Sequence, residues 1–319
     1  METTKNFDLD KSEFECDDPI LHQFLMGCLG ARLKSFNKQL SKVQRGKNGK
    51  KVVHKVRVSS QKTRALLTNF RDFLPDEKYE PIVLGLKSLA AELGFVRELD
   101  VLQKEIKRST KVSYTEKASL GFSVLGDTCS KVILEKRSKV GRAVASFLTS
   151  PNFSYLTDFV SEVPAEEELV SLCQNGAVKS FGERVIKSRL QTVVGYDAVE
   201  AKKPGEDLHQ LRIQLKNLRY TIDDFSCTHV KGYQSQQKQL KKLLKKMGRI
   251  HDRQVWIVQI DELLAVVGEN YGRDGDEYEN GSLAVEILKR KWLRQSLKDF
   301  YKLQQTWQNL KREQFWASF

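Results

Sequence analysis

Apolar side chains recur every three to four residues along almost the whole chain, and strand-like alternation is nowhere sustained. This period is that of an amphipathic α-helix. The six prolines fall between the periodic stretches or in their first turns, where a missing backbone N–H does least harm. The chain is therefore predicted to be all-α. The expected helical segments lie near 19–45, 51–73, 78–107, 114–148, 168–199, 206–227, 231–268 and 283–316.

One stretch of the sequence occurs twice. Residues 54–70 read HKVRVSSQKTRALLTNF and residues 209–225 read HQLRIQLKNLRYTIDDF, so each copy begins with His, has Arg three and ten residues later, and ends on Phe. A second pair, LGFVRELDVL at 93–102 and MGRIHDRQVW at 247–256, aligns at a Gly, an acidic residue and a Val. Helices joined by short connections pack as antiparallel neighbours. We therefore predict two four-helix bundles, one from each half of the chain, related by a pseudo-two-fold axis.

Two stretches interrupt the helical pattern inside the chain. Residues 150–168 contain two prolines and form a predicted connector between a first helical repeat, 19–149, and a second, 169–316. The two repeats are expected to form a single domain, 19–316. Residues 268–282 are polar, acidic and rich in Gly, and we expect a mobile loop without a catalytic role there.

Charge is unevenly distributed along the sequence. The chain has 54 Lys and Arg against 41 Asp and Glu, a net charge of +13, yet residues 1–18 carry seven acids and two lysines. We expect this acidic segment to be flexible. The positive remainder attracts anions, so nucleic acid, polyphosphate or an acidic membrane surface is the expected partner class. No apolar run approaches 18 residues, so membrane insertion is not predicted.

The repeated segment has a cationic face. At about 100° per residue, its apolar residues fall on one stripe of a helix and its cations on the adjacent stripe. The apolar stripe consists of Leu211, Leu215, Leu218, Ile222 and Phe225, and in the first copy of Val56, Thr63, Leu67 and Phe70. The cationic stripe consists of His209, Arg212, Lys216 and Arg219, and in the first copy of His54, Arg57 and Arg64, with Lys62 next to Gln61. Ten residues of helix extend about 15 Å, which suits an extended anion better than a single phosphate.

A stripe of like charges beside an apolar core is unfavourable unless negative charge faces it. The repeat contains no matching acidic stripe. One interpretation is a row of ion pairs to neighbouring helices, for which Glu98, Asp100 and Asp252 are candidates. The other is a phosphate-rich ligand, since Arg binds phosphate oxygens through two N–H groups and Lys acts as a point charge. We favour the ligand.

Residues 238–249, KQLKKLLKKMGR, form a second basic region with cations on one helical face and apolar residues opposite. Such a helix can extend an anion-binding surface, act as a nuclear or nucleolar targeting patch, or lie on an acidic membrane. A solvated charged face above a core stripe is the simpler alternative.

The five cysteines are scattered, with no CxxC pair and no zinc-type spacing, so we expect reduced thiols. The N-terminus lacks the apolar core of a signal peptide. These features predict an intracellular protein of the cytoplasm, or of the nucleus or nucleolus in a eukaryotic host.

No enzymatic machinery is recognisable in the sequence. A general base needs a poised partner and a substrate pocket, and there is no evident nucleophile, metal cluster or Walker-type loop. We therefore predict a non-enzymatic protein with no catalytic residues, no metal site and no cofactor. A polyphosphatase that uses the histidines is the enzymatic alternative.

The two copies of the repeat, each followed by its Gly-containing second segment, resemble the signature segments of CHAD domains, an α-helical family named for its histidines. The second copy fits the family pattern H-x-x-R-I-x-x-K-x-L-R-Y, whereas the first has Gln61 and Thr63 where the family has Arg and Leu. The resemblance covers residues from about 18 to 316. It implies a twinned helical bundle whose basic central groove or pore binds long-chain inorganic polyphosphate.

The resemblance also implies which residues bind the polymer: His54, Arg57, Lys62, Arg64, His209, Arg212, Lys216 and Arg219. Weaker echoes between the two halves add Arg32, Arg184, Arg137 and Arg290. RNA or DNA is the alternative polyanion. Proteins that bind single-stranded nucleic acid stack bases on aromatic residues, and only Tyr220 lies near the stripes, so polyphosphate is favoured.

Overall fold

The computed structural model describes the chain except for residues 1–17, 113, 161–162, 197–198, 200–202 and 229–232. The acidic segment 1–18 thus lies outside the described residues, apart from Asp18. Within the described residues every regular element is a helix, which confirms the predicted all-α class.

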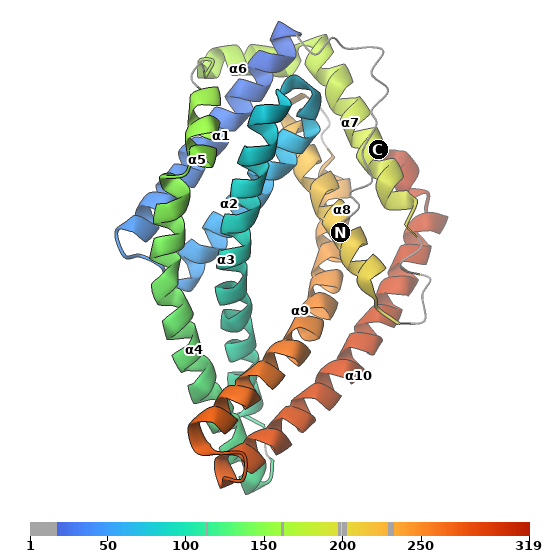
Figure 1. Cartoon of the computed structure of the whole chain (residues 1–319). Coiled ribbons are helices and arrows are strands. Elements are labelled where there is room, and N and C mark those ends of the chain that lie inside the picture. Colours follow the sequence, from blue (N-terminus) through green and yellow to red (C-terminus); the bar gives the residue numbers. More distant parts are fainter. Residues whose placement is uncertain (1–17, 113, 161–162, 197–198, 200–202, 229–232) are drawn as a thin grey trace.

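Ten α-helices make up the described fold (Figure 1). They are α1 (Pro19–Gln44), α2 (Lys50–Asn69), α3 (Asp76–Ser109), α4 (Glu116–Leu148), α5 (Pro151–Phe159), α6 (Glu166–Gln174), α7 (Gly176–Val194), α8 (Glu206–Asp224), α9 (Gln234–Tyr271) and α10 (Asp276–Arg312). Short 3-10 turns η1 (Arg71–Phe73), η2 (Ser226–Thr228) and η3 (Phe315–Ser318) follow α2, α8 and α10. The paired copies of the repeat are α2 and α8.

Local capping explains where several helices begin. The Asp18 carboxylate accepts the Ile20 N–H at 2.9 Å at the start of α1, and Ser150 caps α5 with Pro151 at the first helical position. The predicted connector 150–168 therefore contains a helix, α5, and the first residues of α6. The single helix predicted at 168–199 is divided, because Asn175 accepts the Ala177 N–H at 2.8 Å and starts α7 anew.

The mobile loop predicted at 268–282 is wrong. Helix α9 continues to Tyr271, and α10 begins at Asp276, so only a short turn joins them. Gly272 ends α9 with a φ of 82°, a conformation that glycine adopts without strain. Three acidic residues of this stretch, Asp276, Glu277 and Glu279, occupy the first turn of α10, where the helix dipole stabilises negative charge.

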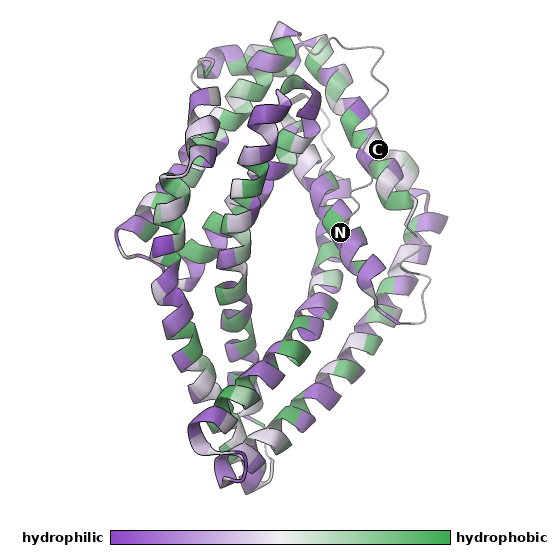
Figure 2. Ribbon diagram, viewed as in Figure 1, coloured by the Kyte–Doolittle hydropathy of each residue, from purple (hydrophilic) through white to green (hydrophobic). Residues whose placement is uncertain are grey.

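Two hydrophobic cores hold the helices together. The larger one contains the aromatic cluster of Phe24, Phe70, Phe181 and Phe225, which come from α1, α7 and the ends of α2 and α8. The smaller one lies where α3, α4, α9 and α10 converge at the bottom of Figure 1. Both cores therefore draw on both halves of the chain. Figure 2 shows the apolar and polar residues mixed along each helix, as expected for amphipathic helices.

Equivalent residues of the two repeats touch each other where α2 and α8 pack together. The Lys216 Nζ donates to Gln61 Oε1 at 2.9 Å, and the rings of Phe70 and Phe225 lie 5.8 Å apart. Contacts of this kind arise beside a two-fold axis. The pseudo-symmetry and the division into repeats at 150–168 stay predictions.

The expectation of reduced thiols is wrong for one pair of cysteines. Cys173 of α6 and Cys227 of η2 form a disulfide across 54 residues of sequence. Cys28 and Cys129 are free, and burial raises the pKa of their thiols to about 11 and about 12. Pairing between distant cysteines without a recognisable framework leaves no signal in a single sequence.

Among the described helices, none combines the length and the apolar composition required to cross a membrane.

Candidate anion-binding site

Helices α2 and α8 bring their cationic stripes together around Lys216. Burial, together with the charges of Arg212, Arg57, Arg64 and Arg219, lowers the pKa of this lysine to about 7. We call these five residues the cation cluster. Because two of them come from the first copy of the repeat and three from the second, the two stripes predicted from the sequence converge.

Several donors of the cation cluster lack acceptors. The Nε atoms of Arg57, Arg64 and Arg219 are buried and have no hydrogen-bond partner within the described part of the chain. Within that same part, no carboxylate lies within ion-pair distance of Lys216 or Arg212. Buried donors without acceptors are rare and unfavourable in folded proteins. An anion with several oxygens would satisfy them.

Two carboxylates lie at one side of the cation cluster. Glu98 is 3.7 Å from Arg57. Asp252 lies close enough to Arg212 for its negative charge to oppose the lowering of the Arg212 pKa by burial. Burial raises the pKa of both carboxyl groups, and for Glu98 the nearby Asp252 adds to this rise. They neutralise the cluster in part. Asp100, the third acid considered from sequence, lies elsewhere.

Two further predicted residues lie beside the cluster and are paired. Lys62 Nζ is 3.4 Å from Asp223 and lies 5.6 Å from the centre of the Tyr220 ring. Arg32 on α1 forms an ion pair with the buried Asp224 at the end of α8. Both are cations that an entering ligand would meet only in competition with a carboxylate.

Two of the arginines suggested by echoes between the two halves, Arg137 and Arg290, are paired with carboxylates that do not belong to the cation cluster. Arg137 donates to Asp100 at 2.5 Å and to the Asn48 carbonyl at 2.7 Å, which ties α4 to α3 and to the start of α2. Arg290 is exposed and pairs with Glu286 at 2.6 Å one turn earlier on α10. Arg184 lies over the Phe181 ring on α7.

The contact between Gln61 and Lys216 explains why the two copies of the repeat carry different residues at this position. Their side chains face each other across the α2–α8 contact, so a lysine at both positions would place two ammonium groups in contact. Two like charges at that distance repel strongly when partly buried. Gln61 avoids this and accepts a hydrogen bond from Lys216 instead.

A family model described as the CHAD domain matches residues 27–261, most of the chain. The chain belongs to the CHAD domain family. Its fold is similar to the crystal structure of the CHAD domain from the plant Ricinus communis, with a TM-score of 0.64 and 18% identity over 90% of this chain and 91% of that one. It is also similar to PptA from Streptomyces chartreusis, with a TM-score of 0.61 and 17% identity over 90% of this chain and 99% of that one. No curated protein matches it.

Three histidines of this CHAD domain, His54, His209 and His251, border the cation cluster. The Nδ1 atoms of His209 and His251 are 3.3 Å apart, so one ring is protonated at Nδ1 and donates a hydrogen bond to the Nδ1 of the other. Burial and the charge of Arg212 lower the pKa of His251 to about 3, and burial lowers the pKa of His209 and His54. All three are thus neutral at neutral pH. His251 was not predicted as a site residue, because only its contact with His209 marks it.

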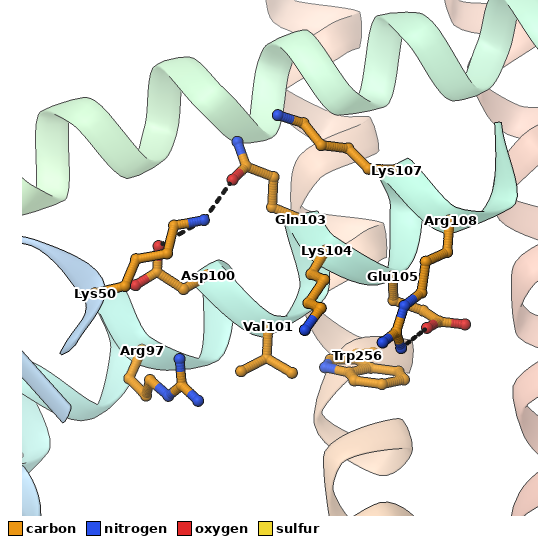
Figure 3. Close-up of a pocket in the computed structure, with 10 residues that line it drawn as sticks. All are labelled: Lys50, Arg97, Asp100, Val101, Gln103, Lys104, Glu105, Lys107, Arg108 and Trp256. Atoms are coloured by element: carbon orange, nitrogen blue, oxygen red, sulfur yellow. Dashed lines mark hydrogen bonds and ion pairs between the residues drawn. The ribbon is translucent and has the colours of Figure 1, made fainter. Parts of the chain in front are cut away.

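A basic pocket of about 420 Å³ lies between α3, α9 and the start of α2 (Figure 3). Arg97, Lys104 and Arg108 lie on the side of α3 that faces Trp256, whereas Lys107 points the other way. These α3 cations were not predicted as site residues, because they belong to no repeated cationic stripe. Across the described residues, no group of three His, Cys, Asp or Glu side chains is arranged to hold a metal ion.

Proposed function

We propose that this CHAD domain binds inorganic polyphosphate in the cation cluster without cleaving it. The observation that carries the proposal is the convergence of four arginines on Lys216, with three buried guanidinium N–H groups that no acceptor meets within the described residues. The family to which the chain belongs is known as polyphosphate-binding. Arginine is suited to such a ligand because it binds phosphate oxygens with two N–H groups at once.

The shape of the cluster favours an extended polymer over a single phosphate. Each helix contributes cations spread over about ten residues, or about 15 Å. Tyr220, which lies beside Lys62 and Arg219, is only 6% exposed and offers no surface on which a base could stack. A polymer of phosphates without bases uses the charges and needs no such surface.

We assign the histidines and arginines of the site to binding and propose no reaction for them. The histidines beside the cluster add no positive charge to it, since their pKa values lie below the ordinary value for histidine. The arginines are permanent cations and serve as anion ligands rather than nucleophiles. We therefore assign them to holding the polymer.

The proposal is tested by neutralising one stripe. A triple variant, Arg212→Gln, Lys216→Gln and Arg219→Gln, is titrated with long-chain polyphosphate in a calorimeter. We expect at least about a hundredfold loss of affinity, because each lost charge-assisted contact contributes about 1 kcal/mol or more. Circular dichroism should show the same helix content as in the unchanged protein.

A matched control removes three charges from the basic face of α9 through Lys238→Gln, Lys241→Gln and Lys245→Gln. These side chains are exposed and lie opposite the buried Leu240 and Leu243. The control should retain most of the affinity. An equal loss in both triple variants would mean that net charge alone attracts the polymer, and would refute a dedicated site.

One observation supports nucleic acid as a second candidate. Trp256 is half-buried beside Arg97 and Lys104, so an aromatic ring and two cations border the same pocket. Single-stranded RNA could stack a base there while its phosphates meet the cations. Titration with single-stranded RNA at equal phosphate concentration separates the two candidates, and tighter binding of RNA would reverse our ranking.

A further inference from the structure

The basic pocket has a counterpart in the second half of the chain. With the alignment that pairs Val101 with Val255, six of the eight α3 residues that line it correspond to the α9 residues that line a second pocket, of about 620 Å³. Each pocket also includes the start of the repeated helix, at Lys50 in the first half and at Gly205 in the second. The pockets share no residue, so the chain has two separate openings at equivalent places.

The two pockets differ in charge. Three cations of the first pocket, Arg97, Lys104 and Arg108, stand where the second has His251, Val258 and Glu262. One cation is thus replaced by a neutral ring, one by an apolar side chain and one by a carboxylate.

The first pocket offers cations that are available to a ligand. Across the described residues, Arg97 and Lys104 have no carboxylate within ion-pair distance, and Lys104 is exposed. Arg108 is 3.4 Å from Glu105 but remains largely exposed. Figure 3 shows Lys104 pointing toward Trp256, while Arg97 lies on the same side of α3 beyond Val101.

The second pocket offers no such cation. Among the described residues that line it, none is a lysine or an arginine. Two of them, Glu206 and Glu262, are exposed carboxylates. Phe95 and Val258 add apolar surface, with Val258 60% exposed. A polyphosphate chain there would meet negative charge and lose water without forming ion pairs.

Both pockets adjoin the cation cluster. On the first side, Arg97 and Arg57 act together on His54, lowering its pKa, and on Asp252. On the second side, His209 and His251 line the pocket, and the nearby charge of Arg212 contributes to lowering the pKa of both rings. A polymer held in the cluster thus has a cationic opening on one side and an uncharged or acidic opening on the other.

We propose that polyphosphate extends from the cation cluster in one direction only, along α3 through the basic pocket beside Trp256, while the equivalent pocket on α9 excludes it. This inference rests on the proposed function and adds the course of the polymer to it. The repeat supplies two equivalent openings. On α9, His251, Val258 and Glu262 stand in place of the three α3 cations, so anions are not attracted to the second opening.

The test places one carboxylate at each of two equivalent positions, with the variants Lys104→Glu and Val258→Glu. Calorimetric titration with long-chain polyphosphate should show about a tenfold or greater loss of affinity for Lys104→Glu. The slope of log affinity against log salt should become shallower by roughly one unit, because one cation contact is lost. Val258→Glu should bind within about twofold of the unchanged protein.

Lys131→Glu on α4 is the matched control, since Lys131 is exposed, lines neither pocket and undergoes the same change in charge as Lys104. It should leave the affinity within about twofold. Tripolyphosphate serves as a short probe that the cluster alone can accommodate. Its affinity should change little in all three variants.

The possible outcomes separate the inference from the proposed function. If Val258→Glu weakens long-chain binding as much as Lys104→Glu does, both openings are used and the one-sided course is wrong. If Lys104→Glu behaves like the Lys131→Glu control, the polymer does not follow α3. If the unchanged protein binds neither polyphosphate nor tripolyphosphate, the proposed function itself fails.

Discussion

In the free protein near neutral pH about half of the Lys216 side chains are charged, because burial and four neighbouring arginines hold the pKa of this ammonium group at about 7. A bound polyanion favours the charged form and raises that pKa. Binding of the polymer is therefore linked to uptake of a proton at Lys216. The three histidines around the cluster do not compete in this range, since their pKa values are lowered.

The pH dependence of affinity follows from this linkage. Below pH 7 Lys216 is charged before the ligand arrives, so affinity is highest there. As the pH rises above about 7, the free protein loses the proton that the complex retains, and affinity falls by up to about tenfold per pH unit. Calorimetry between pH 6 and 9 measures this, and the Lys216→Gln variant supplies the comparison. Its pH profile retains only the titration of the polymer ends, and identical profiles would exclude Lys216 as the linked group.

At the scale of single residues, the sequence predicted that the cations of α2 and α8 converge, but not which of the other predicted cations join them. The stripe residues Arg57, Arg64, Arg212 and Arg219 meet because helical periodicity fixes which face they occupy. Arg137, suggested by its echo of a position in the other half, is instead held by Asp100. A single-position echo carries no information about the neighbours that decide where a long side chain points.

At the scale of the elements, periodicity predicted the helices well, and their ends less well. The apolar stripes of both copies are buried, as is the stripe of Leu240, Leu243 and Met247 beneath the basic face of α9. The division at Asn175 and the tight turn at Gly272 were missed, because capping and a single positive φ depend on one residue and not on a repeated pattern. Whole helices are decided by many residues and are therefore easier to predict.

The disulfide between Cys173 and Cys227 joins α6 to the end of α8 and encloses α7 and α8. A cross-link across 54 residues restricts the unfolded chain. In the chain-entropy model, this stabilises the folded state by about 4 kcal/mol. We expect reduction, or the Cys227→Ser variant, to lower the free energy of unfolding by up to that amount in denaturant titrations.

Cys28→Ser provides the control for this prediction, because Cys28 is a free thiol in the same core. It should leave the difference between oxidised and reduced protein unchanged. Equal denaturation midpoints with and without reductant would show that the cross-link does not form in solution. Polyphosphate affinity well below the unfolding transition should survive reduction, since Cys173 and Cys227 lie on α6 and η2 and the cation cluster lies on α2 and α8.

At the scale of the whole molecule, the two halves are joined at both ends. Near the cluster α2 packs against α8, and at the far end the hairpin of α3 and α4 packs against the hairpin of α9 and α10. The predicted pair of bundles accounts for the helices of each half but not for this second core. Its apolar residues look like ordinary core positions in the sequence, and nothing in their spacing reveals that their partners come from the other half.

The two hairpins approach each other closely at Gly121 of α4, which faces the start of α10. A Cβ atom there would overlap the backbone carbonyl of Asn280 in α10 and would lie 3.0 Å from the Cβ of Ala284. A backbone group cannot rotate away as a side chain can, so Gly121→Ala must push α4 and α10 apart. Forced overpacking of this kind typically costs about 1–3 kcal/mol, and we expect the free energy of unfolding to fall by that amount.

Gly126→Ala, five residues further along α4, is the matched control. Its Cβ would meet only Ile106 at 3.8 Å, an ordinary contact. Alanine is favoured over glycine inside a helix by about 0.5–1 kcal/mol, so this variant should be more stable than the unchanged protein. Thermal and denaturant unfolding of the two variants therefore shift in opposite directions if α4 and α10 meet at Gly121 in solution. A stabilising effect of both substitutions would mean that the hairpins of the two halves stand further apart, and that the smaller core does not join them there.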